Sequence, residues 1–175
     1  IVDACTTLAV GKKATADGSV MASHSADGGG NTDPRLVRIP SGRFAEGSMR
    51  PVFGSPESYP RYVGIDPRSP QIPIPEYLSE NCEDGRAKCL DWKPIGEIPQ
   101  VKETFSYSEA VYGVMNEKSV GIAESTCSAV YTAQPLDVGG NSLLSINALS
   151  QIALERASSS REAVQLMGDL AITYG

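Results

Sequence analysis

A cysteine near the start of the chain has the position of a nucleophile. Cys5 follows four residues and precedes residues 6–10, which are β-branched and apolar and predict a strand. Serine, threonine and cysteine nucleophiles can use the α-amine of a chain terminus as their base. Removal of residues 1–4 would give Cys5 such an amine. The alternative interpretation is structural, because free cysteines are commonly small buried hydrophobic residues.

Polar residues in and just after residues 112–124, which predict a second hairpin, are candidates to act with Cys5. Glu124 ends an apolar segment and is followed by the hydroxyl of Ser125, so the two could line a pocket and contact a substrate ammonium group. The alternative for both is a loop cap. Asn116 and Glu117 have turn-forming chemistry. Contact with a substrate is the second interpretation of Asn116.

The cysteines and the single histidine argue against a metal site. His24 is the only histidine, and no Cys-x-x-Cys pair occurs, so zinc is disfavoured and no cofactor is predicted. Cys82 and Cys89 bracket a polar turn and could close a small disulfide loop of the kind that suits oxidising compartments. The alternative is two reduced loop thiols. Cys127 is interpreted as a free thiol, with a disulfide to Cys82 or Cys89 left open.

The length of the chain and its net charge limit the classes of protein to which it can belong. A chain of 175 residues predicts one domain with a sizeable core. The net charge is −6, with acidic and basic residues interspersed, so the surface offers no footprint for nucleic acid. No run of about 18 apolar residues predicts a membrane span, and the first residues lack the pattern of a signal peptide.

The order of predicted elements indicates an α+β layer structure. Residues 6–10 and 19–23 predict a first hairpin, residues 36–39 a short strand, and residues 112–124 a second hairpin. Residues 51–100 carry nine of the twelve prolines and predict an extended surface excursion, with at best one strand at residues 61–64.

Two helices are predicted at the end of the chain. Ser145 can cap the first helix, and Ser159 and Glu162 form a capping box for the second. The expected apolar faces consist of Ile146, Leu149, Ile152 and Ala153 in the first helix and of Val164, Met167, Leu170, Ala171 and Tyr174 in the second.

Several motifs resemble one known family. Residues 3–8 read Asp-Ala-Cys-Thr-Thr-Leu, residues 10–20 read Val-Gly-Lys-Lys-Ala-Thr-Ala-Asp-Gly-Ser-Val, and Asp27-Gly28 follows. This segment resembles the mature start of the dipeptidase A/secernin family of cysteine N-terminal-nucleophile (Ntn) hydrolases. The resemblance continues through residues 33–37, 47–52, 112–117, 121–127 and 161–167.

The resemblance implies a fold and an activity. The fold would be the αββα sandwich, in which two antiparallel sheets lie between helical layers. The activity would be hydrolysis of dipeptides or short peptides through an acyl-enzyme on Cys5. Asp27 matches an acid that orients the α-amine or substrate. His24 stands where an arginine is expected, so a permanent cation is replaced by a group that is only fractionally protonated at neutral pH.

The resemblance also implies partners and a compartment. Members of the family continue beyond the paired helices, so residues 1–175 are expected to be the N-terminal portion of a single domain. The remaining C-terminal portion, in the same or a separate chain, would supply the oxyanion donor. A secreted or vesicular location is expected. The alternative function is a weak or inactive Ntn-fold protein that serves as a structural or binding component of an extracellular assembly.

Overall fold

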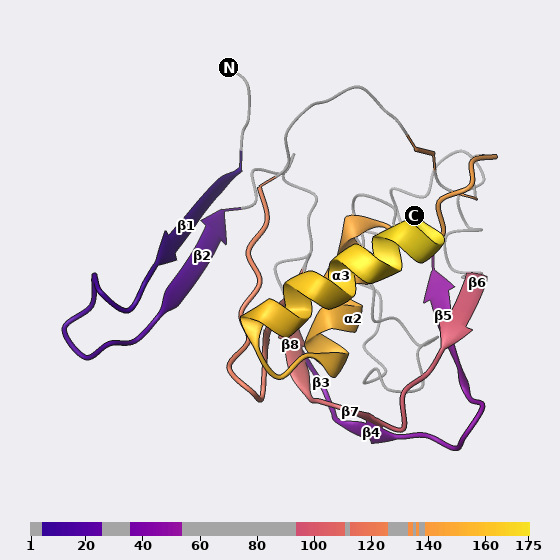
Figure 1. The fold of residues 1–175 in the computed structure, drawn as a ribbon, viewed down its shortest axis with the longest axis horizontal. Helices are drawn as coiled ribbons and strands as arrows, with labels where there is room; N and C mark the ends of the chain where they lie inside the picture. The colour runs from indigo at the N-terminus through magenta and orange to yellow at the C-terminus, as the bar shows by residue number, and fades with distance from the viewer. Residues whose placement is uncertain are drawn as a thin grey trace, which may run out of the picture.

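The computed structural model of the protein describes residues 5–25, 36–53, 94–110, 113–125, 133–134, 136 and 139–175. Every strand pairing among these residues is antiparallel, and two helices follow the strands, as expected for an α+β protein (Figure 1). The strands are β1 (Thr6–Val10), β2 (Met21–Ser25), β3 (Val37–Ile39), β4 (Gly42–Arg43), β5 (Met49–Phe53), β6 (Pro94–Pro99), β7 (Glu103–Thr104), β8 (Tyr107–Glu109) and β9 (Gly113–Asn116), and the helices are α2 (Ile146–Arg156) and α3 (Ser160–Tyr174).

Three of the strand pairs belong to one long antiparallel ribbon, whose first arm is residues 37–53 and whose second arm is residues 94–109. β3 pairs with β8, β4 with β7 and β5 with β6, so residues 37–53 run antiparallel to residues 94–109. Between β4 and β5 the first arm contains extra residues, and Gly47 there has a φ of 77°, which a residue without a Cβ adopts at no steric cost. The pairing therefore shifts by two residues at this point, because Arg43 is opposite Glu103 whereas Met49 is opposite Pro99.

Both ends of the proline-rich stretch are part of this ribbon. The sequence suggested at best a strand at residues 61–64, which lie outside the described residues, but the structure adds β5 and β6. Val52 and Ile98 are each only 1% exposed. Prolines fit here because β5 and β6 form a two-stranded sheet, in which each strand has an edge that needs no N–H donors.

Helix α2 is the centre of the core. Its residues Ala153 and Leu154 pack in a cluster with Val37, Ile39 and Tyr107 of the β3–β8 region. A second cluster places Leu149 and Ile152 against Val52 and Ile98 of β5 and β6. Apolar residues lie on more than one side of α2, as expected for a helix surrounded by the core.

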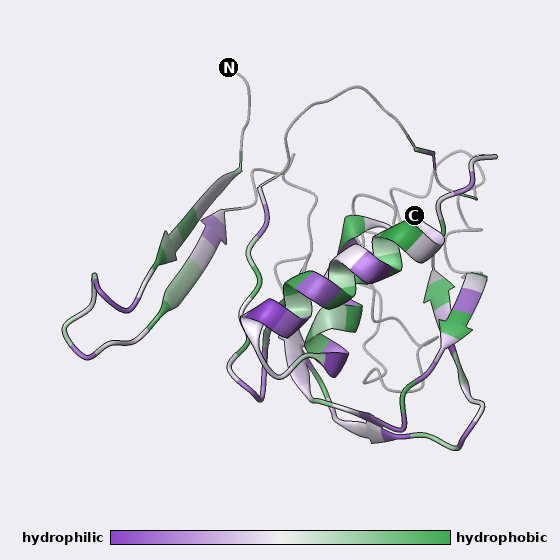
Figure 2. Ribbon diagram, viewed as in Figure 1, coloured by the Kyte–Doolittle hydropathy of each residue, from purple (hydrophilic) through white to green (hydrophobic). Residues whose placement is uncertain are grey.

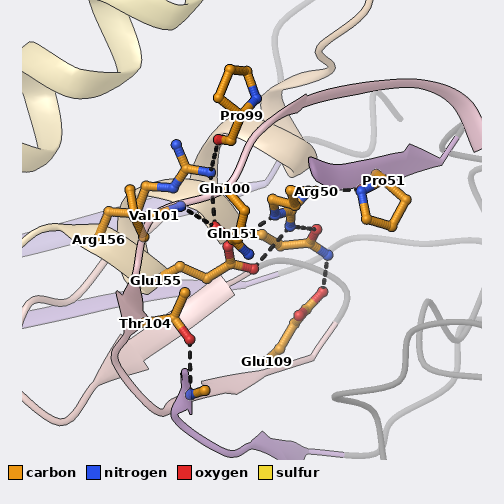
Figure 3. A network of polar contacts seen from close by, with 11 residues as sticks. Arg50, Pro51, Pro99, Gln100, Val101, Thr104, Glu109, Gln151, Glu155 and Arg156 are labelled. Atoms are coloured by element: carbon orange, nitrogen blue, oxygen red, sulfur yellow. Dashed lines mark hydrogen bonds and ion pairs between the residues drawn. The ribbon is translucent and has the colours of Figure 1, made fainter. Parts of the chain in front are cut away.

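A buried ion pair ties α2 to the ribbon. The guanidinium of Arg50 in β5 donates from Nε and from one Nη to the two carboxylate oxygens of Glu155, each at 2.9 Å (Figure 3). The two side chains are 4% and 0% exposed. Gln151, one helical turn before Glu155, donates to the buried carboxylate of Glu109 in β8. The network thus connects β5, α2 and β8.

Asn116 connects the turn after β9 to the end of α2. Its side-chain amide donates to the carbonyls of Leu154 and Ala157 at 2.9 and 2.8 Å. Its side-chain oxygen accepts from the backbone amides of Lys118 and Val120, both at 3.0 Å. Because these carbonyls at the helix end lack helical partners, Asn116 acts as a cap supplied from another element.

The predicted second hairpin is present in outline. Asn116 N donates to the carbonyl of Val120, and Ile122 N donates to the carbonyl of Val114, both at 3.0 Å. Residues 120–122 therefore return alongside β9. Residues 123–125 continue from there toward β1.

Both helix caps predicted from the sequence are confirmed. The Ser145 hydroxyl accepts from Ala148 N, and the Ser159 hydroxyl accepts from Glu162 N. The Glu162 carboxylate accepts from the backbone and hydroxyl of Ser158, and these hydrogen bonds, the backbone one first, hold the pKa of Glu162 below its usual value.

The predicted apolar faces of the helices were wrong at one position each. Ile146 is 52% exposed, although Leu149, Ile152 and Ala153 are buried. In α3, Val164 is 73% exposed, and Ala163 takes its place in the core. The reason is that the packed face of α3 follows Ala163, Met167 and Leu170, which places Val164 on the side away from α2.

The β1–β2 hairpin extends from the side of the molecule that carries residues 113–125 (Figure 1). The register pairs Thr6 with Ser25 and Val10 with Met21, so the second strand begins two residues later than predicted. A long turn explains the shift. The Ser19 hydroxyl and then its backbone amide lower the pKa of Asp17 by hydrogen bonding to its carboxylate, which fixes an Asx-type turn before β2.

The buried ion pair predicts a large effect of removing one partner. Glu155→Gln leaves the Arg50 cation buried without its counterion, and we expect a loss of about 3–5 kcal/mol in the free energy of unfolding, measured by urea denaturation. The double substitution Arg50→Met with Glu155→Leu should cost much less, because it removes both charges. The exposed pair of Arg43 and Glu103 is the control, and Glu103→Gln should cost less than about 1 kcal/mol. A similar loss in the control and in Glu155→Gln would contradict this prediction.

The cap supplied by Asn116 gives a second stability test. Asn116→Ala leaves two carbonyls and two backbone amides without their partner, and we expect a loss of about 2–4 kcal/mol in the free energy of unfolding. Asn116→Asp should not restore it, since a carboxylate cannot donate to Leu154 and Ala157. Lys118→Ala in the same turn removes only a contact with the Phe105 ring and should cost about 1 kcal/mol or less. Equal effects of Asn116→Ala and Lys118→Ala would show that the cap is unimportant.

Candidate functional site

Cys5 lies at the leading end of β1, as predicted. It is half-buried and is not in a disulfide. Side chains alternate between the two faces of a strand, so Cys5 shares a face with Thr7 and Ala9. His24 is the cross-strand neighbour of Thr7. Continued to the residue before β1, this alternation puts the Cys5 side chain on the same face of the hairpin as His24, as its diagonal neighbour.

The segment after β9 reaches the same end of β1. The Ser125 hydroxyl donates to the carbonyl of Cys5 at 2.8 Å. The Thr7 hydroxyl donates to the carbonyl of Glu124 at 2.9 Å. Residues almost 120 positions apart in the sequence are thus held together by two reciprocal hydrogen bonds. The structure therefore places Glu124 and Ser125 next to Cys5. The sequence had suggested only that these two residues could line a pocket.

A cavity of about 550 Å³ lies between the hairpin and the β9 region. Its walls are mainly apolar and include Ala9, Met21 and Ala22 from the hairpin and Met115 and Ile122 from the facing segment, while His24 contributes a polar group. The volume is within the usual range for small-ligand sites. Figure 2 shows apolar colouring on the parts of both hairpin strands nearest the turn and hydrophilic colouring at the arrowhead of β2.

Other predicted site residues lie elsewhere or are not described. Asn116 is 5% exposed, and its amide uses its donors and its acceptor within the fold, so the geometry supports the structural interpretation of this residue. Asp27, Cys82 and Cys89 lie outside the described residues, and so does Cys127.

One contact beside Cys5 was not anticipated from the sequence. The hydroxyl of Ser25, the last residue of β2, accepts a hydrogen bond from Thr6 N at 3.0 Å. The only signal in the sequence is the polar character of residue 25 at the end of a strand. Its partner depends on the register of the hairpin, which places Ser25 opposite Thr6.

Within the described ranges, no group of three or more His, Cys, Asp and Glu side chains could hold a metal ion. No helix in that part of the chain is long and apolar enough to span a bilayer.

Comparison with known proteins identifies a relationship for the first part of the chain. Residues 4–49 match the family model described as peptidase family C69, which is the dipeptidase A/secernin family. The matched segment includes Cys5, His24 and the whole β1–β2 hairpin. No curated protein and no solved structure matches the chain. At the level of the family, the match supports a peptidase. The N-terminal part of the chain is therefore similar to peptidase family C69, as its motifs predict.

Proposed function

We propose that the protein is a cysteine peptidase that hydrolyses dipeptides or short peptides through an acyl-enzyme on Cys5. The observation that carries the proposal is the family match over residues 4–49, which contains the candidate nucleophile. The position of Cys5 at the leading end of β1, beside Glu124 and Ser125, supports it. We further propose that these elements belong to an αββα sandwich and that the protein is secreted or vesicular.

The proposed reaction has two steps on the same sulfur. The Cys5 thiolate attacks the peptide carbonyl carbon, so a C–S bond forms and the C–N bond breaks. The Cys5 α-amine, exposed by removal of residues 1–4, takes the thiol proton and delivers it to the leaving amine. Water then attacks the thioester, which releases the carboxylic acid and restores the thiol. No metal or cofactor takes part in these steps.

The neighbouring groups have roles that suit this chemistry. His24 supplies an imidazole on the same face as Cys5 and, when protonated, would stabilise the thiolate. Glu124 provides a carboxylate for the ammonium group of a short peptide, and Asp27 orients the α-amine. The cavity beside His24 supplies apolar surface for a substrate side chain.

Replacement of the nucleophile tests the proposal directly. Cys5→Ala should lower dipeptide hydrolysis by about a thousandfold or more, because the acyl-enzyme cannot form. The matched control Cys127→Ala removes a different thiol and should keep the activity. The rate is measured by chromatography of released amino acids, with the N-terminus of the active protein determined by mass spectrometry. A native protein that starts uniformly at Ile1 and has no peptidase activity would favour the alternative, an inactive Ntn-fold binding component.

The proposed role of His24 predicts a pH-dependent difference. His24→Arg places a permanently protonated group at this position, whereas imidazole loses its proton as the pH rises. The ratio of kcat of His24→Arg to kcat of the wild type should therefore increase as the pH is raised. A ratio that does not change with pH would contradict a role for the imidazolium charge.

A further inference from the structure

We propose that Ser25 and Ser125 are positioning residues that together hold the peptide unit between Cys5 and Thr6, and thereby the nucleophile. This inference rests on the proposed peptidase function. It assigns a role to Ser25, which the sequence did not single out. It also gives Ser125 a role toward Cys5 that is separate from the predicted contact with substrate.

The two hydroxyls act on opposite ends of one peptide unit. The carbonyl of Cys5 accepts from the Ser125 hydroxyl at 2.8 Å. The N–H of the same unit, which belongs to Thr6, donates to the Ser25 hydroxyl at 3.0 Å. Ser25 comes from β2 and Ser125 from the segment after β9, so the unit is held from two different elements.

Holding both polar ends fixes the orientation of the unit. A peptide unit is planar and cannot rotate about its C–N bond, so two hydrogen bonds at its opposite edges restrict the whole plane. Once residues 1–4 are removed, Cys5 is joined to the chain only through this plane. The α-amine and the thiol can then move only by rotation about the Cys5 Cα–C bond and by the rotamer of the side chain. Such restriction favours the alignment of amine, sulfur and substrate carbonyl that the reaction needs.

A third hydrogen bond keeps Ser125 in place. The Thr7 hydroxyl donates to the carbonyl of Glu124, the residue before Ser125. The Thr7 hydroxyl thus donates to the backbone of residues 124–125, and the Ser125 hydroxyl donates to the backbone of residues 5–7. This reciprocal arrangement fixes the distance between the two segments at the level of Cys5.

The experiment compares hydroxyl removal at these serines with hydroxyl removal elsewhere. The variants Ser25→Ala, Ser125→Ala and Ser125→Thr are made in the protein from which residues 1–4 have been removed, so that Cys5 is the first residue. Thr173→Ala is the matched control, because its hydroxyl donates to the carbonyl of Asp169 at 2.8 Å at an exposed position in α3. For each variant, kcat and KM for a dipeptide are measured, together with hydrogen exchange of the Thr6 amide by NMR. Circular dichroism verifies that each variant is folded.

The expected result is a selective fall in kcat. Each alanine variant should lose about three- to tenfold in kcat, the effect of one net hydrogen bond, with KM unchanged because neither hydroxyl is needed for substrate binding in this role. Exchange of the Thr6 amide should accelerate in both alanine variants. Ser125→Thr keeps the hydroxyl and should stay within about twofold of the wild type, as should Thr173→Ala.

The outcomes separate this inference from the proposed function. If the wild type hydrolyses dipeptides and both alanine variants match Thr173→Ala in kcat, the positioning role is overturned while the peptidase function stands. An increase in KM without a change in kcat would also overturn it and would assign the serines to substrate binding. If the wild type with an exposed Cys5 amine hydrolyses no dipeptide, the proposed function itself fails.

Discussion

The buried pair of Arg50 and Glu155 is the strictest constraint in the described structure, because neither charge can be removed alone without a large cost. Two charges without access to water are tolerable only when each is satisfied by the other, and here both guanidinium contacts are 2.9 Å long. The pair also determines which turn of α2 faces β5, because a bidentate contact allows little sliding. The apolar clusters on either side of α2 then pack in one register.

The candidate site is connected to this pair through a short series of contacts. Asn116 caps the end of α2, and the turn that it organises sends residues 120–122 back along β9. The same segment continues to Glu124 and Ser125, which bond to β1 beside Cys5. The position of Cys5 is thus set by an element far away in the sequence. Rigid support of this kind is what a reactive group requires if it is to meet a substrate in one geometry.

Local features of the fold could be predicted from the sequence, and long-range ones could not. The caps at Ser145 and Ser159 depend on residues within one turn, and the first hairpin depends on a nearby turn. The ribbon of β3 to β8 joins segments on both sides of residues 54–93, and no local pattern encodes that pairing. Arg50 and Glu155 are charged and would be expected at the surface. In the candidate site, Cys5 was singled out by its type and position and its role stays a prediction, whereas the contact of Ser25 is recognisable only once the hairpin register is known.

The ribbon formed by residues 37–53 and 94–109 has a consequence for how the chain folds. Its three pairings have nearly the same register, so closing β5 onto β6 brings the ends of all the others together. The chain then loses the entropy of loop closure only once, when β5 pairs with β6. The pairs β4–β7 and β3–β8 can form after it, one after the other, without closing another long loop. Because that entropy grows only logarithmically with loop length, at about 0.6 kcal/mol for each doubling in a flexible loop, the cost of this one closure depends only weakly on how many residues separate β5 from β6.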